Sequence, residues 1–156
     1  MPLTHKPSVV ATRILDLLVA GMTDLGLRKV YYGDQNKVDE SPTACVEAGP
    51  VNRPMDGVPD MILNTFQVFV IVYHSRVQDN QTTKLEAEQF AEAIEDYLHT
   101  NLQLRDASGD PASEIVIHGW VIENMAGYAT KGVNTLWRAS RLTWQGISKS
   151  SLRFGP

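Results

Sequence analysis

The sequence predicts an α+β fold, with a mostly antiparallel sheet of about five strands and two helices packed on one face. Three observations support this prediction. A long run of β-branched and aromatic residues over 62–76 is typical of a strand. Two segments, 8–25 and 83–98, carry apolar residues at helical spacing. The elements follow in the order helix, strand, strand, long strand, helix, strand, strand, and this order is typical of the α+β class.

Length and composition indicate one domain. A chain of 156 residues with 43% hydrophobic residues can bury a single core. We therefore expect residues 1–156 to form a single domain, with 1–7 and 148–156 as flexible tails. Every apolar stretch is shorter than the roughly 20 residues of a membrane span, and the first residues lack a signal-peptide pattern. Cys45 stands alone, which excludes a disulfide framework and fits a reducing, cytoplasmic folding environment.

The first helix is expected to have Ser8 as its N-cap, and Gly26 suits the left-handed turn after its last residue. Short strands are expected at 28–32 and 43–48, the second ending at a Gly-Pro pair. The segment 51–60 contains three glycine or proline breaks and is expected to be a loop that contacts partners.

The second helix is expected to begin near Thr83, because Thr83 and Glu86 have the spacing of a capping box. Two further strands are expected at 115–123 and 135–146. They would form a hairpin with an extended tip around Tyr128.

The central strand is apolar on both faces. One face carries Phe66, Val68, Val70 and Val72, and the other carries Phe69, Ile71 and Tyr73. A sheet with one solvated face would alternate apolar and polar residues, so this strand needs cover on both sides. Two helices can cover one face, and either loops or a neighbouring subunit must cover the other. Exposed apolar faces of this size usually mark interfaces, which favours the subunit.

The charges are unevenly placed along the chain. The net charge is −4, and every acidic residue lies at or before Glu123. Residues 124–156 contain five of the fourteen basic residues, so residues 1–123 sum to −9. Such a polarity favours head-to-tail association of copies, unless folding brings the opposite charges together. The basic residues are too sparse to indicate nucleic-acid binding.

No pattern of catalytic or cofactor-binding residues is present. The four histidines lack close zinc-ligand spacing, and there is no glycine-rich phosphate loop or nucleophile elbow. His74 and His118 could meet across the sheet near Glu123 and bind a metal, although partly buried strand histidines are the more favoured interpretation. Cys45 lies in a predicted strand, where a cysteine usually serves packing. We therefore expect no enzyme activity, no cofactor and no metal.

Several segments together resemble a known family. They are Ile14-Leu-Asp-Leu-Leu in the first helix, the segment 42–50 before a proline-rich loop, the segment 66–75 directly before an acidic helix, and a hairpin running from His118-Gly-Trp through Gly127-Tyr to the segment 136–143. Over residues 8–147 the chain resembles the tail terminator proteins, also called tail completion or tail-to-head joining proteins, of long-tailed bacteriophages.

The resemblance implies a structural virion protein that is not an enzyme. Such proteins are typically hexameric rings that cap the tail tube, stop its polymerisation and dock to the head. The implied partners are further copies of the chain, the tail tube protein and a connector or stopper protein, while DNA passes through the ring without specific binding. The implied location is the tail or neck of the virion, assembled in the host cytoplasm. Alternatives are another phage neck protein, such as a stopper or head-completion protein, or a small cellular binding module or metal enzyme that uses His74, His118 and Glu123.

No functional residue is carried over from the family, so the expected interface residues follow from composition and pattern alone. They are Arg53, Met55 and Asp56 in the predicted loop, Phe69, Ile71 and Tyr73 on the second strand face, Tyr128 and Lys131 at the hairpin tip, and Arg138 and Arg141 in the last strand.

Overall fold

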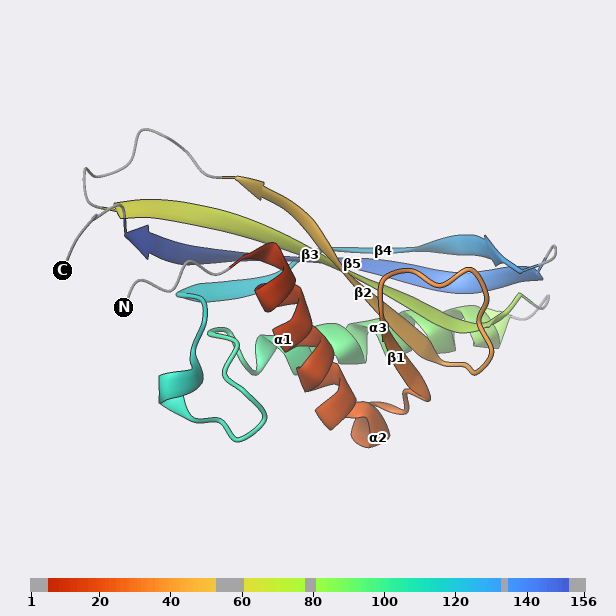
Figure 1. The fold of residues 1–156 in the computed structure, drawn as a ribbon. Coiled ribbons are helices and arrows are strands. Elements are labelled where there is room, and N and C mark those ends of the chain that lie inside the picture. Colours follow the sequence, from red (N-terminus) through yellow and green to blue (C-terminus); the bar gives the residue numbers. More distant parts are fainter. Residues whose placement is uncertain (1–5, 53–60, 78–80, 133–134, 152–156) are drawn as a thin grey trace.

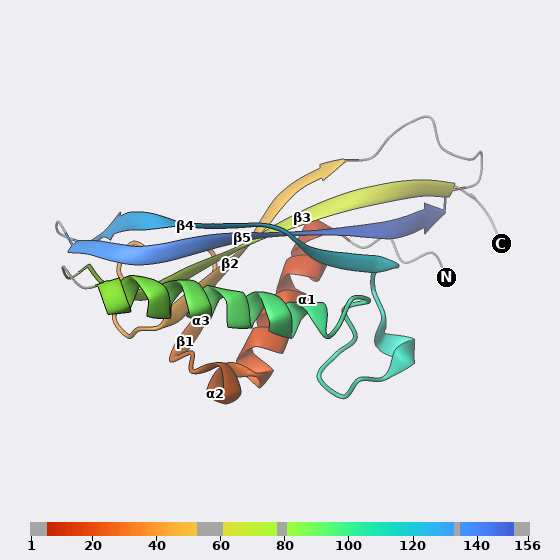
Figure 2. The same cartoon turned by 180° about the vertical axis from the view of Figure 1, so that it is seen from behind.

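The structure, a computed structural model, describes residues 6–52, 61–77, 81–132 and 135–151 and confirms the predicted α+β class. The helices are α1 (Pro7–Ala20), α2 (Met22–Leu25) and α3 (Gln81–His99), with a 3-10 turn at Pro111–Ser113. The strands are β1 (Lys29–Tyr32), β2 (Thr43–Asn52), β3 (Met61–Arg76), β4 (His118–Lys131) and β5 (Thr135–Ser151). The molecule has two layers, with α1 and α3 on the same side of one sheet (Figures 1 and 2).

The sheet has the strand order β1-β2-β3-β5-β4. β1 pairs with β2 in parallel, and the other three pairs are antiparallel. The β3–β5 pair is the longest and extends from Met61↔Ser151 to Arg76↔Trp137. In this order β3 lies at the centre of the sheet, and β1 and β4 form its two edges.

The main core lies between the sheet and the two long helices. The β3 side chains that the period-2 pattern placed on one face are at most 1% exposed, and so are most of their neighbours from α1, α3 and β5. Members of this cluster include Ile14, Leu18, Phe66, Val68, Val70, Val72, Ile94, Leu98, Leu142 and Trp144. Burial of these large apolar side chains is the main favourable contribution to folding.

The parallel β1–β2 pair explains how part of the second face is covered. Adjacent parallel strands cannot be joined by a tight turn, so residues 33–42 must run back along the sheet before β2 begins. This connection, called the strap below, crosses the face opposite the helices. Val38 of the strap forms a second, smaller buried core with three residues of the sheet beneath it: Cys45, Tyr73 and Trp137. One of the two expected covers, a loop, is therefore present at this end of the sheet.

The helix ends differ from the predictions at two points. Ser8 is not the N-cap of α1, because Lys6 occupies that position without a side-chain cap and Pro7 supplies the first helical residue. Pro7 therefore belongs to α1 and not to a tail. Thr83 lies inside α3, which begins at Gln81. Gly26 does adopt the left-handed conformation expected at the helix end, with φ 81°.

The predicted first helix is interrupted at Gly21. A Cβ there would lie 2.7 Å from the ring of Tyr97 in α3. The Tyr97 hydroxyl donates a hydrogen bond to the Leu17 carbonyl over 2.7 Å. The close approach of α3 explains a glycine at this point, and apolar periodicity alone carries no sign of it.

Three strands are longer than predicted. β2 continues through the Gly-Pro pair to Asn52 by means of a bulge between Ala48 and Val51. β4 begins at His118 instead of 115 and runs through the segment that was predicted to be the hairpin tip. β5 reaches Ser151, so residues 148–151 are strand and not tail. The full length of β4 was missed because it is an edge strand. Such a strand pairs on one side only, and its exposed side chains need not form an apolar pattern.

Candidate interaction surface

The part of the sheet that neither helices nor strap cover is called the open face. It consists of Gln67, Phe69 and Ile71 from β3, Arg141, Thr143 and Gln145 from β5, and Trp120, Glu123 and Met125 from β4. The β4 side chains are the most accessible, with Trp120 46% and Met125 56% exposed. Large apolar side chains at such exposure, on the same face of one strand, form a surface that gains stability when another protein covers it.

The polar groups of the open face largely neutralise one another. The Arg141 guanidinium lies 5.1 Å from the ring centre of Phe69, and one of its nitrogens is 3.7 Å from a Glu123 oxygen. The Gln67 amide donates a hydrogen bond to the Gln145 amide oxygen over 3.2 Å. This surface therefore offers apolar contact and little net charge. Its chemistry suits packing against another protein.

The strap is fastened to the sheet by Asp34. Its carboxylate accepts a hydrogen bond from the Tyr73 hydroxyl at 2.6 Å and forms an ion pair with the Lys131 ammonium at 2.7 Å. Its backbone N–H donates to a Glu47 carboxylate oxygen at 2.8 Å. These contacts link the strap to β3, to the end of β4 and to β2. Burial raises the pKa of the Cys45 thiol underneath, so this thiol is protected both by cover and by protonation.

Loosening the strap is expected to expose Cys45. In Asp34→Ala, Tyr73 and Lys131 lose their shared acceptor. The free energy of local opening should then fall by at least about 1.4 kcal/mol. We therefore expect the rate of Cys45 modification by a thiol reagent to rise about tenfold or more. Asp39→Ala is the matched control, because Asp39 is in the same strap and pairs only with the exposed Lys37. Equal labelling rates in the two variants would show that Asp34 does not hold the strap.

Tyr73 should make the free energy of unfolding fall as the pH rises above about 10. Burial, followed by the hydrogen bond to Asp34, raises the pKa of its hydroxyl far above the ordinary value near 10. The folded chain keeps this proton while the unfolded chain loses it above about pH 10, so folding loses up to ~1.4 kcal/mol per pH unit there. Tyr73→Phe lacks the titrating group, and its unfolding free energy in urea should fall less steeply between pH 9.5 and 11 than that of the parent chain. Parallel pH profiles would contradict this assignment.

A groove runs along the other side of β4, between this strand and α3. Its acidic part is a hollow of about 310 Å³ lined by Glu88, Glu92, Glu95, Asn124, Ala126 and Ser140. Toward the start of α3 it continues into a hollow of about 210 Å³, whose lining includes Lys84, Tyr128 and Arg138. The groove is therefore acidic at one end and basic at the other.

The ten residues expected at an interface fall into four groups. Arg53, Met55 and Asp56 lie outside the described residues. The open face holds Phe69, Ile71 and Arg141. Tyr73, 1% exposed, and Lys131 fasten the strap. Tyr128 and Arg138 line the groove, where the guanidinium donates a 3.5 Å hydrogen bond to the phenol. The exposed β4 residues Trp120 and Met125 were not among the predicted interface residues. Met125 lies beyond the predicted end of this strand, and the exposure of Trp120 depends on the position of β4 at the edge of the sheet.

The strand register separates the residues of the alternative metal site. His118 pairs with Ile147, and Ile147 pairs in turn with Thr65. His74 lies nine positions further along β3 than Thr65, about 30 Å at the usual strand rise. His74 instead contacts the Phe90 ring of α3. The hypothesis of a site formed by His74, His118 and Glu123 is therefore wrong.

Within the described residues, Glu95, Asp96 and His99 bring ligand atoms within 4.8 Å of one another. The His99 Nε2 atom, however, accepts a hydrogen bond from the backbone N–H of Val121 at 3.0 Å. That nitrogen serves to fasten β4 to the end of α3. The half-buried Glu95 and the exposed Asp96, beside a histidine nitrogen already used in this way, do not define a metal site.

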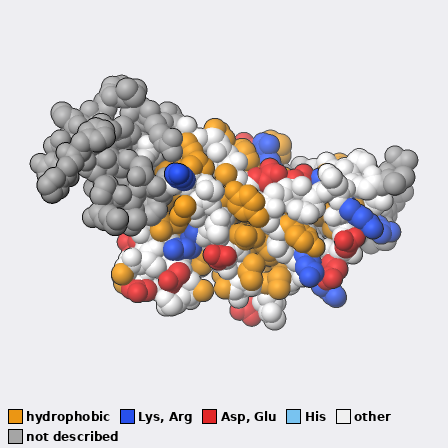
Figure 3. Space-filling view, in the orientation of Figure 1, with side chains coloured by type: hydrophobic (Ala, Val, Ile, Leu, Met, Phe, Trp, Pro, Cys, Tyr) orange, Lys and Arg blue, Asp and Glu red, His pale blue; other side chains and the backbone are white. Residues whose placement is uncertain are grey.

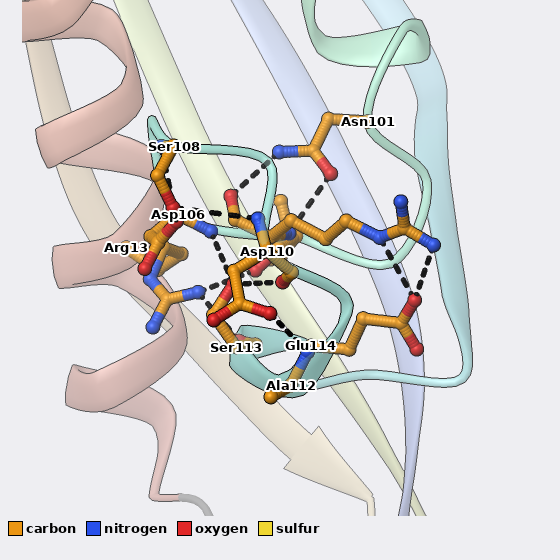
Figure 4. A network of polar contacts seen from close by, with 10 residues as sticks. Arg13, Asn101, Asp106, Ser108, Asp110, Ala112, Ser113 and Glu114 are labelled. Carbon is orange, nitrogen blue, oxygen red and sulfur yellow. Dashed lines mark hydrogen bonds and ion pairs between the residues drawn. The ribbon is translucent and has the colours of Figure 1, made fainter.

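A polar network folds the loop between α3 and β4 (Figure 4). Arg13 of α1 donates from Nη1 to the carbonyls of Leu104 at 2.6 Å and Ser113 at 2.8 Å. Arg105 and Glu114 form an ion pair at 2.7 Å within the loop. These contacts satisfy backbone carbonyls and hold the loop against α1. They explain the conformation of the loop.

In the described part of the chain, no helix has the length and hydropathy that crossing a bilayer requires. The chain matches no protein-family model and no curated protein.

Proposed function

We propose that this chain is a structural virion protein, a tail terminator that caps the tail tube of a long-tailed bacteriophage. In this role copies of the chain form a ring, of six subunits as the resemblance implies, which ends tail polymerisation and offers a docking surface to the head and neck. The proposal requires binding surfaces and no catalytic groups. The resemblance of residues 8–147 to the tail terminator family supports the proposal.

The observation that carries the proposal is the open face. An apolar sheet surface with Trp120 and Met125 about half exposed is costly to leave in water, and covering it by a neighbouring protein recovers that free energy. It lies beside the unpaired edge of β4, so a neighbour could contact face and edge together. Assembly into a larger structure uses both features.

Deletion of the gene in its phage tests the proposal. Electron microscopy of lysates should show tails of uncontrolled length that are not joined to heads. A plasmid copy of the parent chain should restore normal particles, while Met125→Glu should fail because it places a charge on the open face. Leu85→Glu is the control, because Leu85 is 54% exposed on α3, away from the open face. Both variants should first show the parent's circular dichroism.

Tails of normal, controlled length in the deletion would overturn the terminator role. If such tails merely failed to join heads, the chain would belong to another neck position. Restoration by Met125→Glu would remove the open face from the assembly contacts.

A further inference from the structure

The outer edge of β4 is divided into a closed and an open part. β4 is the last strand of the sheet and pairs only with β5. Near its start, His99 occupies the Val121 N–H. Beyond this point residues 123–128 are all exposed. An exposed strand edge is a template to which another extended segment can add by main-chain hydrogen bonds.

The two sides of this open stretch differ in chemistry. Successive residues of an added strand would point alternately to the two faces of the sheet. On the helix side they would meet the acidic part of the groove, where Glu88, Glu92 and Glu95 recur along one face of α3. On the other side they would meet the exposed Met125. The edge therefore suits a segment in which basic and apolar residues alternate.

In the part of the chain that the structure describes, no ion pair involves these three glutamates. Within the described residues, the ion pairs involve other carboxylates, namely those of Asp34, Asp39, Glu114 and Glu123. At the opposite edge of the molecule, near β1 and the strap, side chains of both signs lie close together (Figure 3). The charges of the acidic groove beside β4 are thus less balanced than those at the opposite edge.

The chain itself contains a segment of the required pattern directly after β5. Leu152-Arg153-Phe154 places a basic residue between two apolar ones, and no carboxylate occurs anywhere from residue 124 onward. These three residues lie outside the described part of the chain. Their sequence is complementary both to the groove and to the apolar side of the β4 edge.

The same copy cannot deliver this segment to its own edge. Glu123 at the start of the open stretch pairs with Thr143, and Ser151 lies eight residues further along β5, about 25 Å away. Three residues span at most ~11 Å when fully extended. A second copy of the chain must therefore supply the segment.

We propose that residues 152–154 of one copy add as a strand to residues 123–128 of the next, with Arg153 directed into the acidic groove and Leu152 and Phe154 against the apolar side. The contact is head-to-tail, so it can generate a ring. It deepens the proposed function by naming one contact between neighbours, and it rests on that function only for its place in the particle.

A labelled peptide of residues 148–156 tests the contact in solution with the full-length chain. Fluorescence anisotropy should show saturable binding that Glu92→Lys weakens by about tenfold, a change typical of losing one well-placed charge pair. Glu86→Lys is the matched control, since Glu86 is on the same helix but lines a different hollow, beside His74 and Arg76. An Arg153→Glu peptide should bind poorly to the parent chain and better to Glu92→Lys.

Hydrogen exchange then distinguishes strand addition from simple charge attraction. Bound peptide should slow exchange of the amides in 123–128, and the Arg153→Glu peptide should not. No binding, equal effects of the Glu92 and Glu86 variants, or binding without protection of this stretch would each overturn the contact. These results do not depend on the phage deletion. Normal tails together with peptide binding would overturn the terminator role alone. Defective tails without peptide binding would overturn this contact alone.

Discussion

Trp144→Ala is expected to lower the free energy of unfolding by about 3–5 kcal/mol, the range for removing a large aromatic side chain from a core. Trp144 is 0% exposed and belongs to the main core between the sheet and the helices. Its removal forfeits the buried area and leaves a cavity that rigid strands on both sides cannot close. Urea unfolding followed by circular dichroism measures the loss.

Trp120→Ala provides the comparison for this variant. Trp120 is also a tryptophan of the terminal hairpin, but it is 46% exposed on the open face. Its removal should cost well under half as much, because much of its surface is already in water in the folded chain. Similar losses for the two tryptophans would contradict the placement of Trp144 as the centre of the core.

Gly146→Ala should cost about 1–3 kcal/mol or more, as overpacking of a core does. Gly119 and Gly146 pair across β4 and β5 and form the floor under the Trp144 ring. A Cβ on Gly146 or on Gly119 would lie 2.1 Å from a ring atom of Trp144. Since the indole is enclosed, neither it nor the strand can shift without disturbing neighbours.

Two controls separate this clash from a general effect of alanine. Gly127→Ala lies in β4 too, with nothing within 4 Å of the added Cβ, and should change stability by less than about 0.5 kcal/mol. In a Trp144→Leu background the cost of Gly146→Ala should shrink, because the ring that causes the clash is gone. Equal costs in the two backgrounds would show that the ring is not responsible.

The fold class and the main core could be predicted because they depend on strong periodic signals. The helical spacing of the two long helices and the period-2 pattern of β3 arise directly from burial, so they are visible in the sequence. The extent of β4 is not visible, since residues 123–128 hold their strand conformation by pairing with β5 and bury little surface. The strap escaped prediction because its position follows from parallel pairing of β1 with β2, a long-range choice without a local signal.

The candidate surface was predicted in part for the same reason. Phe69 and Ile71 follow from the two apolar faces of β3, and the open face does include them. Tyr73 shares their face by the same pattern, yet it is buried, because the strap covers it. The acidic stripe of α3 was visible, but its position beside an open strand edge required the tertiary structure.

The hydrogen bond between His99 and Val121 has a consequence for aggregation. Sheets grow into fibrils when long, flat edges stack repeatedly, and proteins resist this by shortening the edge that is available. By occupying one N–H near the start of β4, the histidine confines pairing to a short stretch that contains the charged Glu123 and a glycine, Gly127. One side chain at the end of a helix thus helps to keep a sheet edge that can receive a strand from becoming the seed of an insoluble fibre.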